Sequence, residues 1–268
     1  MNGLVSVVTI CYNAENEIER TLKSVYQQNF QYFEYIVKDG GSTDKTNEIV
    51  KKYIPIFEKR GIKLKHVIEK DHGIYDAMNH AVSKCNHNWV IYMNAGDSFY
   101  SDTVLSDVFC NSSHSLDEAD VIYGHTLFLL NKNKGLIVNH DSEQLEYGWS
   151  LCHQSVFVKR ELLLSNPFDC QYRIVADYDQ MLKLKRSNCR FLCVNSIISA
   201  VDREGLSNVA IKMRYDENNK LIQKYNLPRK NKGMVLGYVK QLLRKAFPWL
   251  EEYFFVKNSM KRVNYYKR

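Results

Sequence analysis

The chain has 268 residues, of which 45% are hydrophobic and 25% charged, a composition typical of a soluble globular protein with a sizeable core. No apolar run approaches the roughly 18 residues of a membrane span, and the first residues lack the pattern of a signal peptide, so we expect a cytoplasmic, unprocessed protein. The seven cysteines are odd in number and scattered without a CxxC pair, which argues against a disulfide framework and a zinc site.

Short β-rich runs alternate with helical periodicity in the first part of the chain, which predicts an α/β fold with a mostly parallel sheet and helices on its faces. In chain order the expected strands are 4–10, 33–38, 63–68 and 89–93. The expected helices between them carry Ile18, Leu22 and Val25, then Ile49, Tyr53 and Phe57, then residues 73–85. Beyond this point we expect strands at 121–123, 126–130, 155–158, 191–194 and 197–200, with a helix near 177–186.

Polar residues follow each of the first four expected strands. They are Tyr12 and Asn13, the segment 39–44 (DGGSTD), the segment 69–73 (EKDHG) and the segment 94–97 (NAGD). In an open α/β sheet, ligands bind beyond the carboxyl ends of the strands. Any one of these loops also fits turn and capping residues, but four of them at one sheet edge predict a ligand, because clustered carboxylates need a cation or a donor-rich partner.

The phosphate-binding patterns GxGxxG and GxxxxGK[ST] do not occur, so a bound nucleotide needs another source of positive charge. Mg²⁺ or Mn²⁺ is commonly held by one or two carboxylates while substrate phosphates complete its shell. We therefore predict a divalent metal at Asp97 that bridges a diphosphate and stabilises its departure.

The segments 7–13 (VVTICYN), 37–44 (VKDGGSTD), 69–79 (EKDHGIYDAMN) and 94–97 together resemble the family-2 glycosyltransferases of the GT-A fold. Residues 73–79 are similar to the branch that builds bacterial exopolysaccharides and O-antigens, including colanic-acid-type enzymes. The resemblance implies a Rossmann-like sheet with helices on both faces. It also implies an inverting hexosyltransferase that moves a sugar from a nucleoside-diphosphate donor, of the UDP-sugar type, to an acceptor hydroxyl in cell-surface polysaccharide biosynthesis.

The resemblance also assigns site residues. Those implied to bind the nucleotide sugar are Thr9, Tyr12, Asn13, Glu17, Asp39, Gly40, Ser42, Asp71, Asp76, Asn79, Asn94, Ala95, Gly96, His153 and Gln154. Asp39 is expected to reach the base. Segment 94–97 stands where the family has its metal-binding DxD, with Asn94 in place of the first acid, so Asp97 is the expected metal ligand and His153 a second candidate. An amide oxygen is a weaker ligand than a carboxylate, which bears on how strictly the enzyme needs metal.

The segment 175–179 (VADYD) falls where the family places an acidic pair that includes the catalytic base. Ala176 replaces the first acid, and Asp177 aligns with the second. We predict that Asp177 takes the proton of the acceptor hydroxyl as that oxygen attacks the anomeric carbon. The alternative is that Asp177 only begins the helix that follows it. The segment 204–207 (EGLS) resembles a stretch before a mobile loop that closes over the diphosphate.

The net charge of +7 is concentrated at the C-terminal end, where residues 228–268 carry eleven Lys or Arg against two Glu. Aromatic and aliphatic residues lie among these charges, as in amphipathic helices on anionic membranes. We expect this segment to bind the inner face of the cytoplasmic membrane, with a polyprenyl-diphosphate-linked saccharide as acceptor. Packing of the segment on its own domain is the alternative, and we expect no nucleic acid partner.

These expectations divide the chain into a nucleotide-sugar-binding half (1–98), an acceptor-binding and catalytic half of the same domain (99–210) and a basic helical tail (211–268). Two other functions stay open. A sugar nucleotidyltransferase is also an α/β enzyme with a metal and a nucleotide, although it typically has a glycine-rich, arginine-containing loop after its first strand. A catalytically inactive carbohydrate-binding or membrane-binding relative would explain Asn94 and Ala176.

Overall fold

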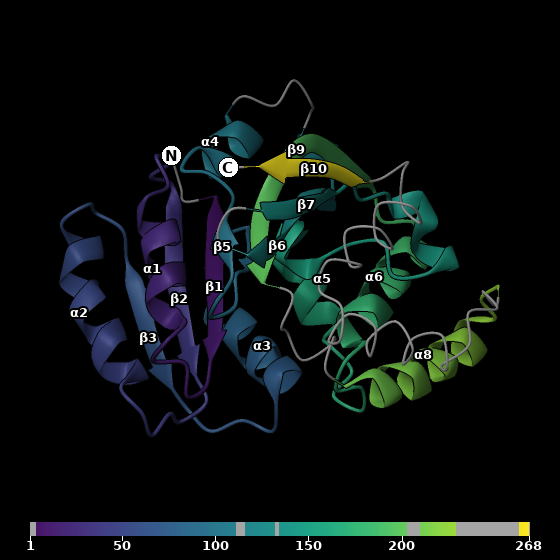
Figure 1. The fold of residues 1–268 in the computed structure, drawn as a ribbon, viewed down its shortest axis with the longest axis horizontal. Coiled ribbons are helices and arrows are strands. Elements are labelled where there is room, and N and C mark those ends of the chain that lie inside the picture. The colour runs from purple at the N-terminus through teal and green to yellow at the C-terminus, as the bar shows by residue number, and fades with distance from the viewer. Residues whose placement is uncertain (1–3, 111–115, 132–133, 203–209, 229–262, 268) are drawn as a thin grey trace.

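The computed structural model describes residues 4–110, 116–131, 134–202, 210–228 and 263–267 (Figure 1). Strands and helices alternate through the first part of the chain. They are β1 (Val5–Cys11), α1 (Ile18–Tyr26), β2 (Phe33–Asp39), α2 (Thr46–Glu58), β3 (Leu64–Ile68), α3 (Ile74–Ser83) and β4 (Trp89–Tyr92). β1 pairs in parallel with β2 on one side and β4 on the other, and β2 pairs in parallel with β3. The predicted α/β fold with a mostly parallel sheet in this part is confirmed.

The second part of the chain extends the same sheet with strands whose pairing is mostly antiparallel. Its elements are β5 (Ser98–Phe99), α4 (Val104–Phe109), η1 (Leu116–Glu118), β6 (Val121–Asn131), β7 (Lys134–Val138), η2 (Ser142–Tyr147), η3 (His153–Ser155), β8 (Val156–Lys159), α5 (Arg160–Ser165), α6 (Ala176–Arg186), β9 (Phe191–Asp202), α8 (Ile211–Tyr225) and β10 (Val263–Lys267). The described strands form one sheet in the order β10-β7-β6-β8-β4-β1-β2-β3, with β9 paired to β6 and to β5. The strands of the first and second parts of the chain therefore share one sheet.

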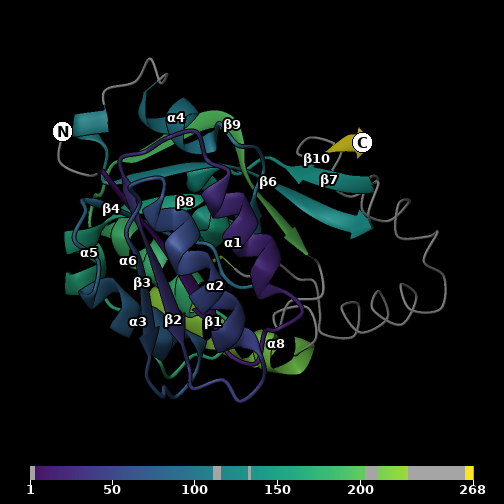
Figure 2. The ribbon, with the colours of Figure 1, turned by 90° about the vertical axis from the view of Figure 1, so that its left-hand side faces the viewer.

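Helices cover both faces of this sheet because successive side chains of β1 point to opposite sides. Val5 and Val7 pack in a cluster with α1, α2 and α4, whereas Val8 and Ile10 pack in a cluster with α3, α6 and α8. Figures 1 and 2 show the two layers of helices with the sheet between them. Because β1, β2, β3 and β4 run parallel to one another, the loops that follow them lie at the same edge of the sheet.

Two pairs of expected strands are each a single strand in the structure. The runs 121–123 and 126–130 merge into β6, and the runs 191–194 and 197–200 merge into β9. β6 and β9 pair in parallel with shifts in register around His125. A Cβ atom on Gly124 would lie 2.6 Å from the carbonyl oxygen of Ser196, so only glycine fits at this irregularity. The break in the apolar pattern around His125 therefore marks a β-bulge within one strand and not the end of a strand.

The C-terminal end differs from the helical tail that the sequence suggested. α8 is helical, as expected, but residues 263–267 form β10, which pairs antiparallel with β7 at the sheet edge. Val263, Tyr265 and Tyr266 are of the β-branched and aromatic types that favour strands. Segment 229–262 and the glycine-containing stretch 204–207 lie outside the described residues. None of the helices in the part of the chain that the structure describes is long and apolar enough to cross a membrane.

Candidate active site

The loop after β2 is held by the carboxylate of Asp39. Oδ1 accepts hydrogen bonds from the backbone N–H groups of Gly41 (2.7 Å) and Ser42 (2.6 Å), and Oδ2 accepts one from the Ser42 hydroxyl (2.6 Å). Asp39 itself is fully buried. The carboxylate therefore supports the shape of this loop, and a contact between Asp39 and a base stays a prediction.

The loop after β1 is locked onto the loop after β2. The backbone N–H of Asn13 donates to Ser42 Oγ (2.8 Å), and Asn13 Oδ1 accepts from the backbone N–H of Thr43 (2.9 Å). Asn13 has a positive φ of 48°, a conformation that asparagine tolerates better than most residues. Tyr12 is 63% exposed, and a Cβ atom on Gly40 would lie 3.3 Å from its ring. The two loops together present an exposed aromatic ring beside a glycine, an arrangement on which a flat base can stack.

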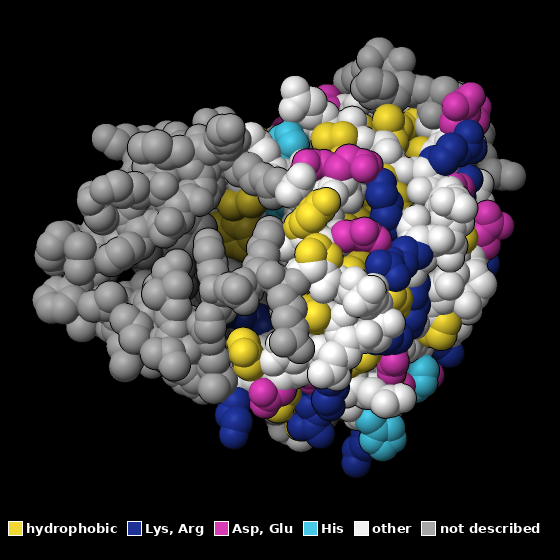
Figure 3. All heavy atoms as spheres, turned by 90° about the vertical axis from the view of Figure 1, so that its right-hand side faces the viewer, with side chains coloured by type: hydrophobic (Ala, Val, Ile, Leu, Met, Phe, Trp, Pro, Cys, Tyr) yellow, Lys and Arg dark blue, Asp and Glu magenta, His cyan; other side chains and the backbone are white. Residues whose placement is uncertain are grey.

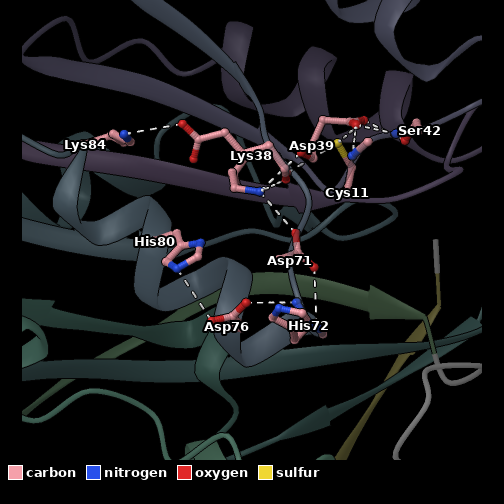
Figure 4. A network of polar contacts seen from close by, with 12 residues as sticks. Cys11, Lys38, Asp39, Ser42, Asp71, His72, Asp76, His80 and Lys84 are labelled. Atoms are coloured by element: carbon pink, nitrogen blue, oxygen red, sulfur yellow. Dashed lines mark hydrogen bonds and ion pairs between the residues drawn. The ribbon is translucent and has the colours of Figure 1, made fainter.

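Lys38 ties the loops after β2 and β3 together (Figure 4). Its side chain is fully buried, and its ammonium group donates to the backbone carbonyls of Asp39 and Glu69 and pairs with Asp71 Oδ2 at 3.1 Å. A Cβ atom on Gly40 would lie 3.0 Å from the same Asp71 oxygen, so the absence of a side chain at Gly40 lets the carboxylate approach. Asp71 is therefore held at the edge of the predicted nucleotide site.

The other residues that were predicted to bind the nucleotide sugar fall into two groups. Thr9 is buried, and its hydroxyl contacts Tyr35 Oη (2.8 Å) and the Met93 carbonyl (2.6 Å) within the sheet. Asn79 donates to the carbonyl of Phe168 and accepts from its N–H, both at 2.9 Å. These two side chains are engaged in holding the fold. Glu17 and Asp76 lie closer to the loops: Glu17 packs beside Gly96, and Asp76 Oδ2 accepts from the backbone N–H of His72.

The loop 94–97 after β4 is fixed by α1. Thr21 Oγ1 accepts from the backbone N–H of Gly96 (3.0 Å) and donates to the carbonyl of Asp97 (2.7 Å). Gly96 has a φ of 95°, which favours glycine at this position. Ala95 continues the sheet, since its N–H donates to the Ile10 carbonyl. This anchoring aims the side chains of Asn94 and Asp97 toward the second half of the chain.

Asp97 is 8% exposed and accepts one side-chain hydrogen bond, from Gln154 Nε2 to Oδ2 at 2.8 Å. Burial raises the pKa of Asp97 to about 6, although the Gln154 hydrogen bond and the nearby His153 oppose the rise. A buried carboxylate with one neutral partner is stabilised by a cation, so the electrostatics of this position favour a positively charged ligand.

His153 connects this loop to Asp177. Its Nε2 lies 3.1 Å from Asn94 Nδ2, and its Nδ1 lies 3.2 Å from Asp177 Oδ2. The hydroxyl of Tyr75 reaches Asp177 Oδ1 at 3.1 Å, and the pKa of Tyr75 is raised by burial and by the Asp177 charge. Asp177 is 3% exposed. The structure thus joins the predicted metal loop and the predicted base, which lie about 80 residues apart in sequence, through one imidazole ring.

The donor set suits a hard divalent cation. Asn94 Oδ1 is buried without a hydrogen-bond partner in the part of the chain that the structure describes, and Asp97 offers a carboxylate beside it. Two oxygen ligands leave the remaining positions of a Mg²⁺ or Mn²⁺ shell to water and substrate phosphates. Among the described residues, no group of three His, Cys, Asp or Glu side chains is placed to hold a metal ion, so a protein-only metal cage is absent there.

Sequence reasoning missed Lys38, Thr21 and Tyr75. A lysine in the middle of the apolar strand segment YIVKD was a signal, because a charged side chain inside a buried strand needs a partner. Tyr75 was adjacent to the predicted Asp76 in the segment GIYDAMN, but its contact with Asp177 joins residues 102 apart. Thr21 had no local signal, since threonine in a helix is common on either face.

The sequence profile described as Glycosyl transferase family 2 matches residues 6–109. A PGL/p-HBAD biosynthesis glycosyltransferase of Mycobacterium bovis is 29% identical over 66% of this chain and 67% of its own length. A putative teichuronic acid biosynthesis glycosyltransferase, TuaG of Bacillus subtilis, is 35% identical over 37% of this chain and 38% of its own length. The matched region includes all four strand-end loops.

Two solved structures share the fold at low sequence identity. S. aureus TarS 1-349 in complex with UDP has a TM-score of 0.60 at 18% identity, covering 90% of this chain and 71% of that one. Mannosyltransferase PcManGT from Pyrobaculum calidifontis, in complex with GDP-Man and Mn²⁺, has a TM-score of 0.64 at 16% identity, covering 93% and 72%. The second half of this chain, beyond the profile match, therefore also follows the fold of such proteins.

Proposed function

We propose that the chain is a family-2 glycosyltransferase that moves one sugar from a UDP-type nucleotide-sugar donor to a saccharide hydroxyl with inversion at the anomeric carbon. The observation that carries the proposal is the contact chain from Asn94 through His153 to Asp177. This contact chain supports a site in which loop 94–97, the expected metal-binding loop, lies next to Asp177. Asp177 is the one acid of the predicted acidic pair that this sequence keeps. A transferase needs both functions at one reacting carbon.

In this proposal the donor's base lies against Tyr12, within reach of Asp71. The loop after β2, with Asp39 as its internal support, forms the floor of the nucleotide site. The side chains of Asn94 and Asp97 would hold a divalent metal, Mn²⁺ or Mg²⁺, with His153 as a further candidate ligand. Such an ion neutralises charge on the diphosphate as it leaves. PcManGT was solved with GDP-Man and Mn²⁺, which supports a metal in this fold.

The transfer step follows from the position of Asp177. The acceptor oxygen attacks the anomeric carbon on the side opposite the diphosphate, and the bond from that carbon to the diphosphate oxygen breaks with its electron pair. The acceptor proton passes to Asp177. The hydroxyl of Tyr75 and the ring of His153 hold one oxygen each of that carboxylate, so it does not need to reorient during the step. General base catalysis of this kind contributes on the order of 10²–10⁴-fold.

We propose a place for this reaction in cell-surface polysaccharide biosynthesis. The relatives named for PGL/p-HBAD and teichuronic acid biosynthesis support this setting, since both names refer to glycan-bearing products. The basic composition of residues 229–268 supports an acceptor linked to a lipid diphosphate at the inner face of the cytoplasmic membrane. The resemblance of the segment GIYDAMN to the exopolysaccharide and O-antigen branch supports the same setting.

Asp177→Asn tests the chemistry. The substitution keeps the size of the side chain but removes the proton acceptor, so we expect turnover to fall by about 10²–10⁴-fold while the dissociation constant for UDP with Mn²⁺ stays within two-fold. Asp216→Asn, an exposed acid on α8, is the matched control and should retain turnover. Near-normal turnover of a folded Asp177→Asn protein would show that Asp177 is not the base. A retained anomeric configuration in the NMR spectrum of the product would contradict the inverting mechanism.

A further inference from the structure

α8 is part of the catalytic half, although the sequence placed it in the tail. Leu221 is fully buried and Leu227 is 6% exposed, and both pack in the hydrophobic cluster that includes the apolar side of α6. Near the C-terminal end of α8, Lys224 Nζ and Tyr225 Oη each lie 2.8 Å from Oδ1 of Asp179, a fully buried residue of α6. The two helices are therefore joined by apolar packing and by a buried charged contact.

Glu217 of α8 reaches the backbone just before α6. One carboxylate oxygen accepts a hydrogen bond from the N–H of Arg173 (2.8 Å), and the other accepts from the N–H groups of Ile174 (2.8 Å) and Val175 (3.2 Å). Glu217 is 6% exposed, so these bonds are shielded from water. Hydrogen bonds between a carboxylate and N–H groups are among the stronger ones in proteins.

These contacts lie at the start of α6. Helix N-termini leave N–H groups without partners inside the helix, and a side chain at the N-cap usually satisfies one of them. The N-cap of α6 is Val175, which has no such side chain, and Asp177 Oδ1 accepts the N–H of Tyr178 in the first turn. Glu217 accepts the N–H of Val175 itself and of the two residues before it, and its negative charge is favourable beside the positive end of α6.

The same short segment leads directly to Asp177. The hydroxyl of Tyr75 lies 2.9 Å from the carbonyl of Ile174 and 3.1 Å from Asp177 Oδ1. The N–H of Ile174 is bonded to Glu217, so the backbone of this residue is held from both sides. Any shift of the segment moves the second residue of α6, which is Asp177.

We propose that Glu217 is a positioning residue for the catalytic base. It holds the segment 173–175 in place by accepting hydrogen bonds from the N–H groups there, and so fixes the backbone that leads into Asp177, whose Oδ1 accepts the N–H of Tyr178 (2.9 Å). Asp177 then keeps an oxygen available for the acceptor hydroxyl. This inference rests on the proposed role of Asp177, and it makes α8 a required element of the acceptor half.

The test compares Glu217→Ala, Glu217→Gln and Asp216→Ala, the last an exposed acid on the same helix. Each variant is assayed at least 15 °C below its own melting temperature. We expect Glu217→Ala to lower kcat by about 10–100-fold while KM for the donor and the UDP dissociation constant stay within two-fold, because the donor loops are not in contact with Glu217. Glu217→Gln should fall between wild type and Glu217→Ala, since one amide oxygen replaces two carboxylate oxygens. Asp216→Ala should retain wild-type kcat.

A double variant separates positioning from general stability. If Glu217 acts through Asp177, adding Glu217→Ala to Asp177→Asn should leave the residual turnover unchanged. A wild-type kcat for folded Glu217→Ala would overturn the proposal, and so would a loss of donor affinity as large as the loss of kcat. The proposal would also fail if the two substitutions together lowered turnover by the product of their separate effects. Near-normal turnover of Asp177→Asn alone would instead overturn the proposed function, so the two failures are distinguishable.

Discussion

At the scale of single residues, Asp97 and Asn94 illustrate how a buried site can favour function over stability. Asp97 is nearly excluded from solvent, with its charge supported mainly by a neutral amide, and Asn94 Oδ1 is buried without a partner among the described residues. Both arrangements cost free energy in the protein alone and become favourable when a cation binds. They therefore support the proposal that the two residues bind a ligand.

Asp97→Asn should stabilise the metal-free protein. The pKa of Asp97 is about 6 in the folded protein against 3.8 for the ordinary side chain, so ionisation of Asp97 opposes folding. Because the folded state binds the proton more tightly, wild-type stability falls as pH rises from about 3.8 to 6 and stays lower above that. We expect the variant to gain up to roughly 2–3 kcal/mol in unfolding free energy at pH 7.5.

Urea unfolding of both proteins in EDTA, between pH 3.5 and 8, measures this difference. The gap should narrow as the pH falls below 6 and be smallest at pH 3.5, where the Asp97 carboxyl is mostly protonated in both states. Addition of Mn²⁺ and UDP should stabilise the wild type more than the variant. A constant gap across this pH range would show that the effect of the substitution does not come from the Asp97 charge.

At the scale of elements, the sequence predicted the strands and helices of the first half because their apolar residues repeat with clear periods. Val5 to Ile10 reads as a strand buried on both faces, and Ile18, Leu22 and Val25 read as one helix face. The sequence predicts two short strands in place of each of the long strands β6 and β9, because Gly124, His125 and the polar residues near 195 interrupt their apolar pattern at the bulge.

The candidate site was predictable only in part. The strand-end loops and Asp177 follow from local segments and the family resemblance. The roles of Asp39, Glu217 and Tyr75 depend on contacts between residues far apart in sequence, for which one sequence carries no local pattern. The buried pair of Lys38 and Asp71 is of the same kind, although the lysine itself stood out within its strand.

Lys38→Met should weaken the nucleotide site more than it weakens the rest of the protein. The substitution keeps the apolar stem of the side chain but leaves Asp71, whose side chain is 13% exposed, without its cation. We expect a loss of about 1–3 kcal/mol in unfolding free energy and a rise in KM for the donor. Lys84→Met is the control, because its pair with Glu69 is longer (3.6 Å) and exposed, and it should change stability by under about 0.5 kcal/mol. Equal effects of the two substitutions would contradict a special role for Lys38.

At the scale of the whole molecule, the positive charge and the catalytic body are separate in sequence but joined in the fold. On the face shown in Figure 3, Lys and Arg side chains lie among Asp and Glu side chains. Pairs such as Lys185 with Glu143 (2.5 Å) and Arg186 with Glu146 (3.0 Å) connect α6 to η2. In sequence, residues 229–262 lie between α8, which packs in the hydrophobic core, and β10, which pairs with β7.

Changing Lys240, Arg244 and Lys245 to Gln tests the membrane role of this segment. Each basic residue near an anionic surface contributes about 1 kcal/mol, so the partition coefficient onto vesicles containing phosphatidylserine should fall on the order of 10²-fold. Changing the exposed Lys51 and Lys52 of α2 and Lys59, which follows it, to Gln removes the same charge and is the control. Vesicle co-sedimentation at two salt concentrations measures both. Equal losses for the two variants would indicate that only net charge matters, and unchanged binding would refute the role of the segment.

The release of nucleoside diphosphate from a panel of nucleotide sugars, with and without Mn²⁺, tests the central claim most directly. Our account predicts metal-stimulated release by the wild type in the presence of a saccharide acceptor. Asp97→Asn should lose metal stimulation and donor affinity, whereas Asp177→Asn should keep donor affinity and lose turnover. Absence of release with every donor and acceptor would contradict a transferase and favour a binding protein derived from one, and equal release by the wild type and both variants would show that the chemistry takes place elsewhere.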